Sequence, residues 1–439
     1  MSAAFDLDPY LARAEEAQPV QADGKVVDVV GLTIEAMGPR MCVGDMCFVC
    51  PRGDHGRIPV EVVGFRGDRI LLMALGNTHG IGPGCLLKPT FAPLQTPVGH
   101  SLLGRVVNSL GHPIDGGPPI QPAAMVPLLA EPPKPLERRR ILEPIATGIR
   151  AVDACITCGK GQRVGIMSGS GVGKSKLIGM VARNTNADVN VIALVGERGR
   201  EVREFIEVDL REEGLRRSVV VVATGDEPAL LRLKGAYAAT AVAEWFRDQG
   251  ADVMLMMDSV TRFAMAQREI GLAVGEPPTT KGYPPSVYAM LPRLLERAGT
   301  NARGSITGFY AVLVEADDLN DPIGDATRSI LDGHIALSRD LASRGHYPPI
   351  DVLDSVSRSI LDVTEEAHQS LALEMRRHLA TYRDAEDLVN IGAYVKGSNP
   401  DIDAALRVMP AIRAFLRQDL FERAPFEEVV TAMRRALGR

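Results

Sequence analysis

The sequence predicts an α/β fold in three parts: a core with a parallel sheet, a small β-barrel before it and a helical domain after it. Strand-like and helical stretches alternate from residue 149 to about 361, as in a parallel sheet covered by helices on both faces. Short apolar runs between glycine-rich turns fill residues 26–91, which is typical of a small barrel. After residue 360, apolar residues recur with helical spacing to the end of the chain.

The composition is that of a soluble globular protein. Of the 439 residues, 46% are hydrophobic and 24% are charged, and the length allows two or three domains. The net charge of −6 argues against a chain that binds nucleic acid or an anionic membrane through its overall charge. No apolar run is long enough to cross a bilayer, and the first residues do not resemble a signal peptide. We therefore expect a cytoplasmic protein.

Two segments precede the core. Residues 1–20 carry a weak helical stripe, and we expect either a frayed terminus or a docking segment for a partner. Residues 21–92 form the predicted barrel, a fold that binds RNA in some proteins. This stretch has seven Lys and Arg against seven Asp and Glu, and only three aromatic residues, so it lacks a basic groove and stacking platforms. A structural or assembly role is the better interpretation.

The core domain is expected over residues 93–362 and the helical domain over residues 363–439. Residues 93–145 are rich in proline and glycine, which predicts an irregular connector wrapped on the core. Strands are predicted at 163–167, 189–195, 218–223, 252–257 and 308–314, and helices at 231–249, 364–382 and 404–415.

Residues 162–175, Q-R-V-G-I-M-S-G-S-G-V-G-K-S, run from an apolar strand through a glycine-rich turn into a helix. Such a turn directs backbone N–H groups inward, and the helix N-terminus and a lysine add positive charge, so it binds phosphate. Ser168 stands where the strict motif has glycine, which keeps a chance glycine turn as an alternative. The expected nucleotide contacts are Gly169, Ser170, Gly171, Val172, Gly173, Lys174, Ser175 and Lys176, with the Ser175 hydroxyl on Mg²⁺.

Two carboxylates follow apolar strands. Asp258 ends V-M-L-M-M-D, and an acid at the carboxyl end of a parallel strand is the Walker B pattern for holding Mg²⁺; the alternative is a helix N-cap. Glu197 ends V-I-A-L-V-G-E, where an ionised carboxylate could accept the proton of an attacking water. Pairing of Glu197 with Arg198 or Arg200 as surface charges is an equally good interpretation.

Three further side chains are candidates by residue type. Arg262 lies one helical turn after Asp258, and Arg358 follows the Asp- and Ser-rich turn D-S-V-S. A guanidinium at either position could stabilise developing negative charge, although a salt bridge is the ordinary role of a lone arginine. Tyr347, in G-H-Y-P-P, could stack on an adenine or simply pack in its turn.

The six cysteines include two C-x-x-C pairs, Cys47/Cys50 and Cys155/Cys158. The pairs lie far apart in the sequence, and no histidine follows either pair at the spacing of a zinc ligand. We expect free thiols in a reducing compartment rather than a metal or redox site.

A series of long motifs, in order, resembles the type III protein-export ATPases, which are related to the alpha and beta subunits of rotary ATP synthases. The motifs are S-G-S-G-V-G-K-S, L-V-G-E-R-G-R-E-V-R-E-F, M-D-S-V-T-R-F-A, G-E-P-P-T-T-K-G-Y-P-P-S-V, S-I-L-D-G-H-I-A-L-S-R and H-Y-P-P-I-D-V-L-D-S-V-S-R. The resemblance extends from about residue 24 into the C-terminal helices and is nearest to the flagellum-specific members. It implies a RecA-like P-loop core that hydrolyses ATP with Mg²⁺, in a homohexameric ring with nucleotide sites at the subunit interfaces.

The resemblance also assigns roles that the residues alone leave open. Lys174 and Ser175 match the phosphate and Mg²⁺ contacts, Asp258 the Walker B acid and Glu197 the catalytic glutamate. Arg198 and Arg262 match two arginines that line the site in the family. Arg358 matches an arginine finger that acts on the neighbouring subunit's nucleotide, and Tyr347 matches an adenine-stacking aromatic.

The family further implies partners. The N-terminal segment would dock on a stator-like regulator, and residues 275–285 would face a central pore that holds a stalk protein. The C-terminal helices would engage that stalk, export substrates and chaperones. The protein would then associate peripherally with the export apparatus and its gate at the inner membrane, and no nucleic-acid partner is expected.

Four rival functions fit less well. The ATPase of a virulence-type type III secretion system is the nearest, and the segment V-K-G-S-N-P-D-I-D from Val395 favours the flagellar interpretation modestly. A rotary ATP synthase catalytic subunit would carry an acidic tip motif in its helical domain, which is absent. An RNA translocase is disfavoured by the neutral barrel. A ring subunit that does not hydrolyse nucleotide would lack Glu197 or the loop lysine, and both are present.

Overall fold

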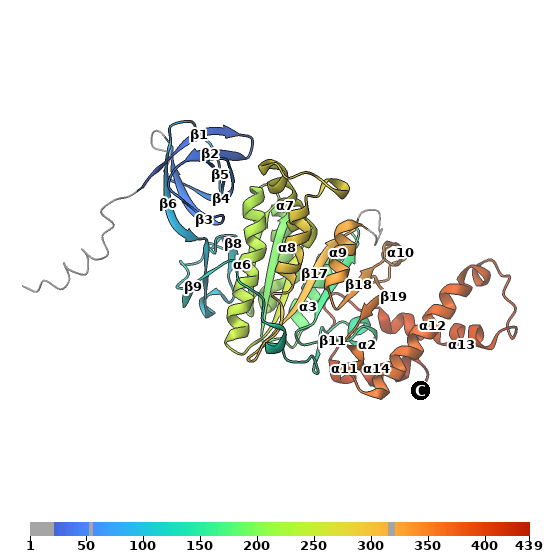
Figure 1. Cartoon of the computed structure of the whole chain (residues 1–439). Coiled ribbons are helices and arrows are strands. Elements are labelled where there is room, and N and C mark those ends of the chain that lie inside the picture. The colour runs from blue at the N-terminus through green and yellow to red at the C-terminus, as the bar shows by residue number, and fades with distance from the viewer. Residues whose placement is uncertain (1–21, 52–55, 315–320) are drawn as a thin grey trace, which may run out of the picture. The chain divides into compact units, whose positions relative to one another are not determined.

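The structure, a computed structural model, describes residues 22–51, 56–314 and 321–439 (Figure 1). The chain divides into two compact units, Met1–Leu94 and Gln95–Arg439. The predicted docking segment at residues 1–20 lies outside the described residues. Within the described ranges, no helix combines the length and the apolar composition needed to span a lipid bilayer.

The first unit is a closed six-stranded barrel, as the sequence predicts. All its neighbouring strands pair antiparallel, in the order β1-β2-β5-β4-β3-β6. Side chains that alternate along the strands fill the interior, among them Val26, Ile34, Cys47, Val60 and Leu72. The strands are β1 (Gly24–Val30), β2 (Thr33–Met37), β3 (Asp45–Cys50), β4 (Ile58–Arg66), β5 (Arg69–Ala74) and β6 (Leu86–Pro93).

The second unit is built on a nine-stranded sheet with the order β19-β18-β12-β17-β15-β13-β14-β8, and β16 pairs with β17 beside this path. The strands from β18 to β8 run parallel, whereas β19 and β16 are antiparallel to their neighbours. The strands are β8 (Val106–Asn108), β12 (Arg163–Ser168), β13 (Val189–Glu197), β14 (Ser218–Thr224), β15 (Asp252–Asp258), β16 (Gly299–Thr300), β17 (Ser305–Leu313), β18 (Gly333–Leu337) and β19 (Ile350–Ser357).

Helices cover both faces of this sheet, which explains why its strands are apolar on both sides. In β15, Met254 and Met256 belong to the core on the face of α3 (Lys174–Asn184), while Val253 and Leu255 are equally buried on the opposite face. There α6 (Ala229–Asp248) packs on β13, β14 and β15, and α7 (Val260–Val274) packs on β13 and β17 (Figure 1). The predicted α/β core is therefore confirmed.

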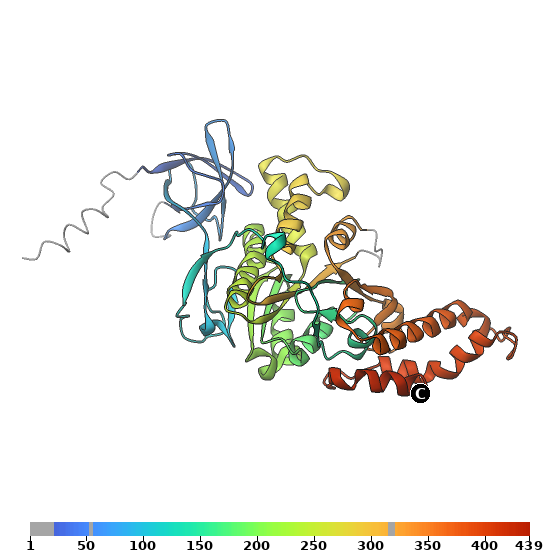
Figure 2. The ribbon, with the colours of Figure 1, turned by 60° about the horizontal axis from the view of Figure 1, so that its bottom comes forward.

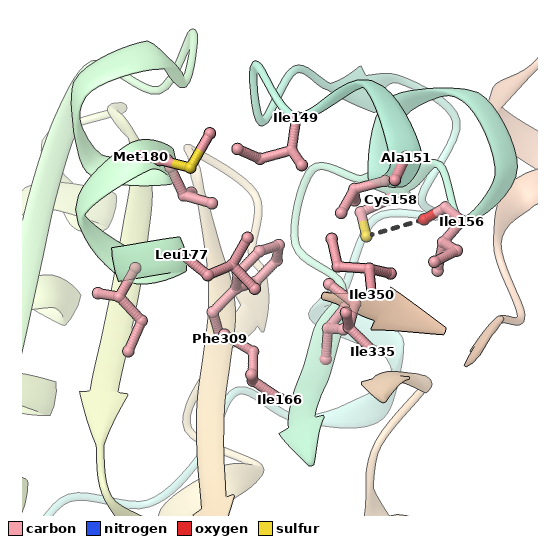
Figure 3. Close-up of a cluster of buried hydrophobic side chains, with 14 of the residues drawn as sticks. Ile149, Ala151, Ile156, Cys158, Ile166, Leu177, Met180, Phe309, Ile335 and Ile350 are labelled. Atoms are coloured by element: carbon pink, nitrogen blue, oxygen red, sulfur yellow. Dashed lines mark hydrogen bonds between the residues drawn. The ribbon is translucent and has the colours of Figure 1, made fainter. Parts of the chain in front are cut away.

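Figure 3 shows the apolar core on the α3 face. Leu177 of α3 lies against Phe309 of β17, Met180 of the same helix lies nearest Ile149, and the cluster continues across the sheet strands to Ile350 of β19. The Cys158 thiol lies in this cluster and donates to the Ile156 carbonyl oxygen at 3.2 Å. Burial also raises the pKa of the Cys155 thiol to about 12, so both thiols are protonated core groups.

The connector is more regular than the sequence predicts. β7 (Gln95–Val98) and β9 (Ala124–Pro127) form a two-stranded antiparallel sheet, and β8 joins the main sheet beside β14. β8 has only three residues, too few for a periodic signal, and its pairing partner is distant in sequence. β16, β18 and β19 were likewise not predicted. β10 (Pro144–Ile145) and β11 (Cys158–Gly159) form a further small pair.

The C-terminal helices share the core of the sheet rather than forming a separate one. α12 (Glu366–Asn390) and α13 (Pro400–Leu416) lie side by side, as Figure 2 shows. Together with α14 (Val429–Ala436) they pack on the short helix α2 (Arg150–Cys155), and α12 also packs on β19. Leu371, Met375, Ile412 and Met433 thus belong to the same buried cluster as the α3 side chains.

Candidate active site

The glycine loop connects β12 to α3. Gly171 and Gly173 adopt positive φ angles of 76° and 114°, and Gly173 is the N-cap of α3. Ser168 is the last residue of β12; it is fully buried, and its carbonyl accepts a hydrogen bond from Val314 N at 3.0 Å. A strand residue needs no glycine, so the departure from the strict motif at Ser168 leaves the loop geometry intact.

The loop opens into a cavity of about 330 Å³. Most of the predicted site residues line it, together with several that were not predicted. Val172 is the exception in the loop, because its side chain is buried in the core. The lining residues are Gly169, Ser170, Gly171, Gly173, Lys174, Ser175, Lys176, Glu197, Arg198, Glu201, Glu204, Asp209, Arg262 and Leu313.

A charged cluster lies at the base of this cavity. Lys174 Nζ forms an ion pair with Asp258 Oδ1 and lies 3.7 Å from Glu197 Oε1. Ser175 Oγ lies 3.5 Å from Asp258 Oδ2. The three ionisable side chains are each less than a fifth exposed, at 10%, 16% and 3% for Lys174, Glu197 and Asp258. The sheet places them together because β13 and β15 are neighbours and end at the same edge.

Asp258 is not the N-cap of the following helix. That role falls to Ser259, whose Oγ accepts from Arg262 N at 3.3 Å at the start of α7. The Asp258 carboxylate is therefore free to contact Lys174 and Ser175.

Asp258 and Ser175 together satisfy a chemical test for Mg²⁺. They present a carboxylate and a hydroxyl, both hard oxygen ligands, beside the lysine that would move to the phosphates. The residues present therefore fit this ion.

Glu197 has the environment of a general base. Burial, and next the negative charge of Asp258, raise the pKa of Glu197 to about 7, although the Lys174 ammonium opposes the shift. Neither Arg198 nor Arg200 forms an ion pair with Glu197 in the described part of the chain: Arg198 instead pairs with Glu201 at 3.3 Å. The surface-pair interpretation of Glu197 is thus excluded in this structure.

The two arginines in the cavity differ in exposure. Arg198 is the N-cap residue of α4 (Gly199–Glu204), and its side chain is 80% exposed at the cavity rim. Arg262 packs its carbon chain on Gly196, where an added Cβ would come within 2.8 Å of the Arg262 Cβ. Its Nε is buried and has no hydrogen-bond partner among the described residues. A buried guanidinium nitrogen without a partner is suited to an anion in the cavity.

Besides Val172 and Asp258, which lie behind the cavity wall, two predicted site residues lie outside this cavity. Arg358 follows β19 at the sheet edge, is exposed, and forms no side-chain hydrogen bond or ion pair within the described ranges. Tyr347 is 53% exposed, and two residues later Pro349 lies beside Gly173, 3.9 Å from the position of an added Cβ. One chain therefore does not bring Arg358 to its own glycine loop.

Sequence reasoning missed several residues of the cavity. Glu201 and Glu204 follow Glu197 at spacings of four and seven, which is a helical face that the sequence could have revealed. Asp209 pairs with Lys176 at 2.9 Å from the π-helical turn η3 (Phe205–Leu210). Arg339 donates to the Ser170 carbonyl oxygen at 3.1 Å, across a separation of 169 residues that no local pattern reports.

Comparison with known proteins gives full-length matches. Residues 148–357 match the nucleotide-binding domain of the ATP synthase alpha/beta family, and residues 364–435 match the T3SS EscN ATPase C-terminal domain. The flagellum-specific ATP synthase of Bacillus subtilis is 53% identical, with 94% of this chain and 95% of that protein covered. The type 3 secretion system ATPase of Xanthomonas euvesicatoria is 50% identical, with 93% and 92% covered.

A solved structure extends the match to the fold. The assembled ATPase EscN of the enteropathogenic E. coli type III secretion system superposes with a TM-score of 0.88 at 42% identity, covering 94% of this chain and 100% of that one. EscN in complex with its central stalk EscO matches with a TM-score of 0.87. With its RecA-like core, its glycine loop and these matches, the chain is an ATPase that belongs to the family of flagellum-specific and type III secretion system ATPases.

Proposed function

We propose that this protein hydrolyses ATP to energise flagellar type III protein export, and that it does so as a homohexameric ring. The observation that carries the proposal is the division of the candidate site. The cavity is lined by Lys174, Ser175 and Glu197, with Asp258 directly behind Lys174. Arg358, by contrast, is exposed at another edge of the same unit, and its side chain has no partner among the described residues. A second copy of the chain could supply that arginine.

Within one chain the proposed roles follow from position. Lys174 and the backbone N–H groups of the glycine loop hold the β- and γ-phosphates, and Lys174 leaves Asp258 when it does so. Ser175 and Asp258 would hold Mg²⁺, which would supply positive charge to neutralise the phosphates. Glu197 accepts the proton of the attacking water.

The remaining roles need groups from the rim of the cavity or from outside it. Arg198 and Arg262 would contact phosphate oxygens from their positions in the cavity lining. Arg358 of a neighbouring subunit would stabilise the charge that develops on the transferred phosphoryl group, as an arginine supplied in trans does in other nucleotide hydrolases. Tyr347 would stack on the adenine beside Gly173.

The proposed partners are those of a ring that drives export. EscN is described as assembled and as bound to a central stalk. We infer the same ring and a stalk in the pore for this chain, with residues 275–285 facing the stalk. A regulator at the N-terminal segment, chaperones and export substrates at the C-terminal helices, and an export gate at the membrane complete the proposal. A virulence-type secretion system is the second candidate, favoured by the 50% identity to the Xanthomonas protein.

Mixing two inactive variants tests the shared site. Lys174→Ala removes the phosphate contact, and Arg358→Ala removes the proposed finger, so each ring alone should release almost no phosphate from ATP. When both variants are combined, some interfaces pair an intact loop with an intact Arg358, and ATP hydrolysis should recover. A mixture that remains as inactive as its components would contradict a site shared between subunits. The matched control for Arg358→Ala is Arg407→Ala, which removes another exposed arginine, on α13.

A further inference from the structure

We propose that Gln418 is a positioning residue for the loop that carries Tyr347, and that the C-terminal helices thereby set the affinity of the site for the nucleotide base. The inference rests on the proposed contact between Tyr347 and adenine. Gln418 lies two residues beyond α13, far in sequence from the glycine loop, and belongs to the C-terminal domain family match rather than the nucleotide-binding one.

The backbone of the loop from Tyr347 to Pro349 is held in place through its carbonyl groups. Pro348 and Pro349 have no backbone N–H, so they cannot donate hydrogen bonds. Each of the three carbonyl oxygens accepts one: Tyr347 from Gln418 N at 2.9 Å, Pro348 from Ile350 N at 2.9 Å and Pro349 from Ser338 N at 2.8 Å. Ile350 and Ser338 are near the loop in sequence, whereas Gln418 is about 70 residues away, and its bond is made at the residue whose ring would meet the base.

The side-chain amide of Gln418 forms three hydrogen bonds. The residue is 4% exposed, and its Oε1 accepts from Arg150 N at 2.9 Å. Its Nε2 donates to the Gly148 carbonyl oxygen at 2.7 Å and to the Glu422 carbonyl oxygen at 3.1 Å. A buried amide with both N–H groups and its oxygen bonded is held in one orientation, so the side chain of Gln418 fixes the backbone N–H that holds Tyr347.

Neighbouring contacts hold the chain around Gln418 against the nucleotide-binding part of the unit. Arg150 Nε donates to the Phe415 carbonyl oxygen at 2.8 Å, and its other nitrogens contact the Arg417 carbonyl and the Glu422 carboxylate. The Phe421 ring lies under the Arg211 guanidinium, with 3.3 Å from Cζ to the ring centroid. A displacement of the C-terminal helices would therefore move the Tyr347 carbonyl.

The elements that carry the phosphate contacts are held by bonds of their own. β12, which leads into the glycine loop, is held by its ladders to β17 and β18, and α3 begins directly after the loop. Within the described ranges, Gln418 forms no hydrogen bond with either element, and its partners are Tyr347, Gly148, Arg150 and Glu422. Loss of Gln418 should consequently affect ligands that carry a base and spare those that carry only phosphates.

The test compares two ligands on the full-length chain by titration calorimetry with Mg²⁺: ADP, which has a base, and inorganic tripolyphosphate, which has none. Gln418→Ala and the isosteric Gln418→Met should each weaken ADP about tenfold, the scale of one lost base-stacking contact, and leave tripolyphosphate unchanged. The matched control is Gln369→Ala on α12, which also removes two bonds to backbone carbonyls, at Leu361 and Thr364. It should change neither affinity.

The outcomes separate this inference from the proposed function. Tripolyphosphate binding reports an intact glycine loop, so an equal loss of both ligands in both Gln418 variants would mean general destabilisation and overturn the inference. Unchanged ADP affinity in both variants would overturn it as well. Tyr347→Ala tests the premise that Tyr347 contacts adenine. If this variant binds ADP with unchanged affinity, the adenine role of Tyr347 is wrong and the inference fails with it. If Tyr347→Ala weakens ADP binding but the Gln418 variants do not, only the inference is refuted.

Discussion

The proposed site has two halves, the charged cluster at the glycine loop and the distant Arg358, and they differ in exposure and in the pairing of their charges. Lys174 and Asp258 are buried and Glu197 is partly buried, and the lysine is already paired with a carboxylate of its own chain. Arg358 is exposed and has no partner in the described part of its chain. Buried charges need a partner before the nucleotide arrives, because an unpaired charge in the interior is strongly destabilising, whereas a hydrated guanidinium has no such requirement. The difference indicates that one half is prepared by folding and the other by assembly.

The largest expected effect comes from the buried half. Lys174→Ala should abolish ATP hydrolysis, because it removes the phosphate contact and leaves Asp258 buried without its cation. Phosphate release at saturating ATP measures this, and Lys396→Ala, an exposed lysine in the loop before α13, should hydrolyse ATP as the unmodified protein does. Retained turnover in Lys174→Ala would remove the glycine loop from the proposed mechanism.

The exposed half should show a different signature. Arg358→Ala should lower kcat by about 10³-fold, as for other arginine fingers, and leave nucleotide binding largely intact. The loss should be seen only at protein concentrations where rings form. If Arg358→Ala hydrolyses ATP normally in the assembled state, the residue is structural, and the contrast between the two halves is wrong.

The smallest effect is a dependence on pH. The pKa of Glu197 lies near 7 in the free protein, and the base must be ionised to accept a proton. The value of kcat/KM should therefore level off above pH 7 and fall about tenfold for each pH unit below it. Glu197→Gln cannot ionise, so its much lower rate should lose this slope. A slope that persists in Glu197→Gln would assign the titration to another group.

The sequence could predict the buried half because its signals are local. A strand, a glycine turn and Lys174 are contiguous, and Asp258 and Glu197 each end their own apolar strand. The order of those strands in the sheet was not needed, since the carboxyl ends of parallel strands meet at one edge. The same reasoning predicted the central strands and the long helices, but not the three-residue β8.

The rest could not be predicted, because it depends on contacts across long sequence separations. Arg339 reaches the glycine loop from α10 (Arg339–Ser343), and Gln418 reaches Tyr347 from beyond α13. Neither residue has a neighbour pattern that reports its partner. From the residues alone the roles of Glu197 and Arg358 also stayed undecided, and only the family resemblance assigned them. Like the roles of Lys174, Ser175 and Asp258, they remain predictions.

The continuous core that joins α3 to the C-terminal helices limits how the protein can be recombined with its relatives. A chimaera cut at residue 363 would have to match Leu371, Met375, Ile412 and Met433 to the foreign sheet, because these side chains interlock with it. At the tip of the α12–α13 hairpin, by contrast, Ile391 and Val395 are 75% and 69% exposed. Exchanging the loop at this tip would change the surface that the hairpin presents to a partner without disturbing the core. The hairpin tip is therefore the better place to alter partner specificity.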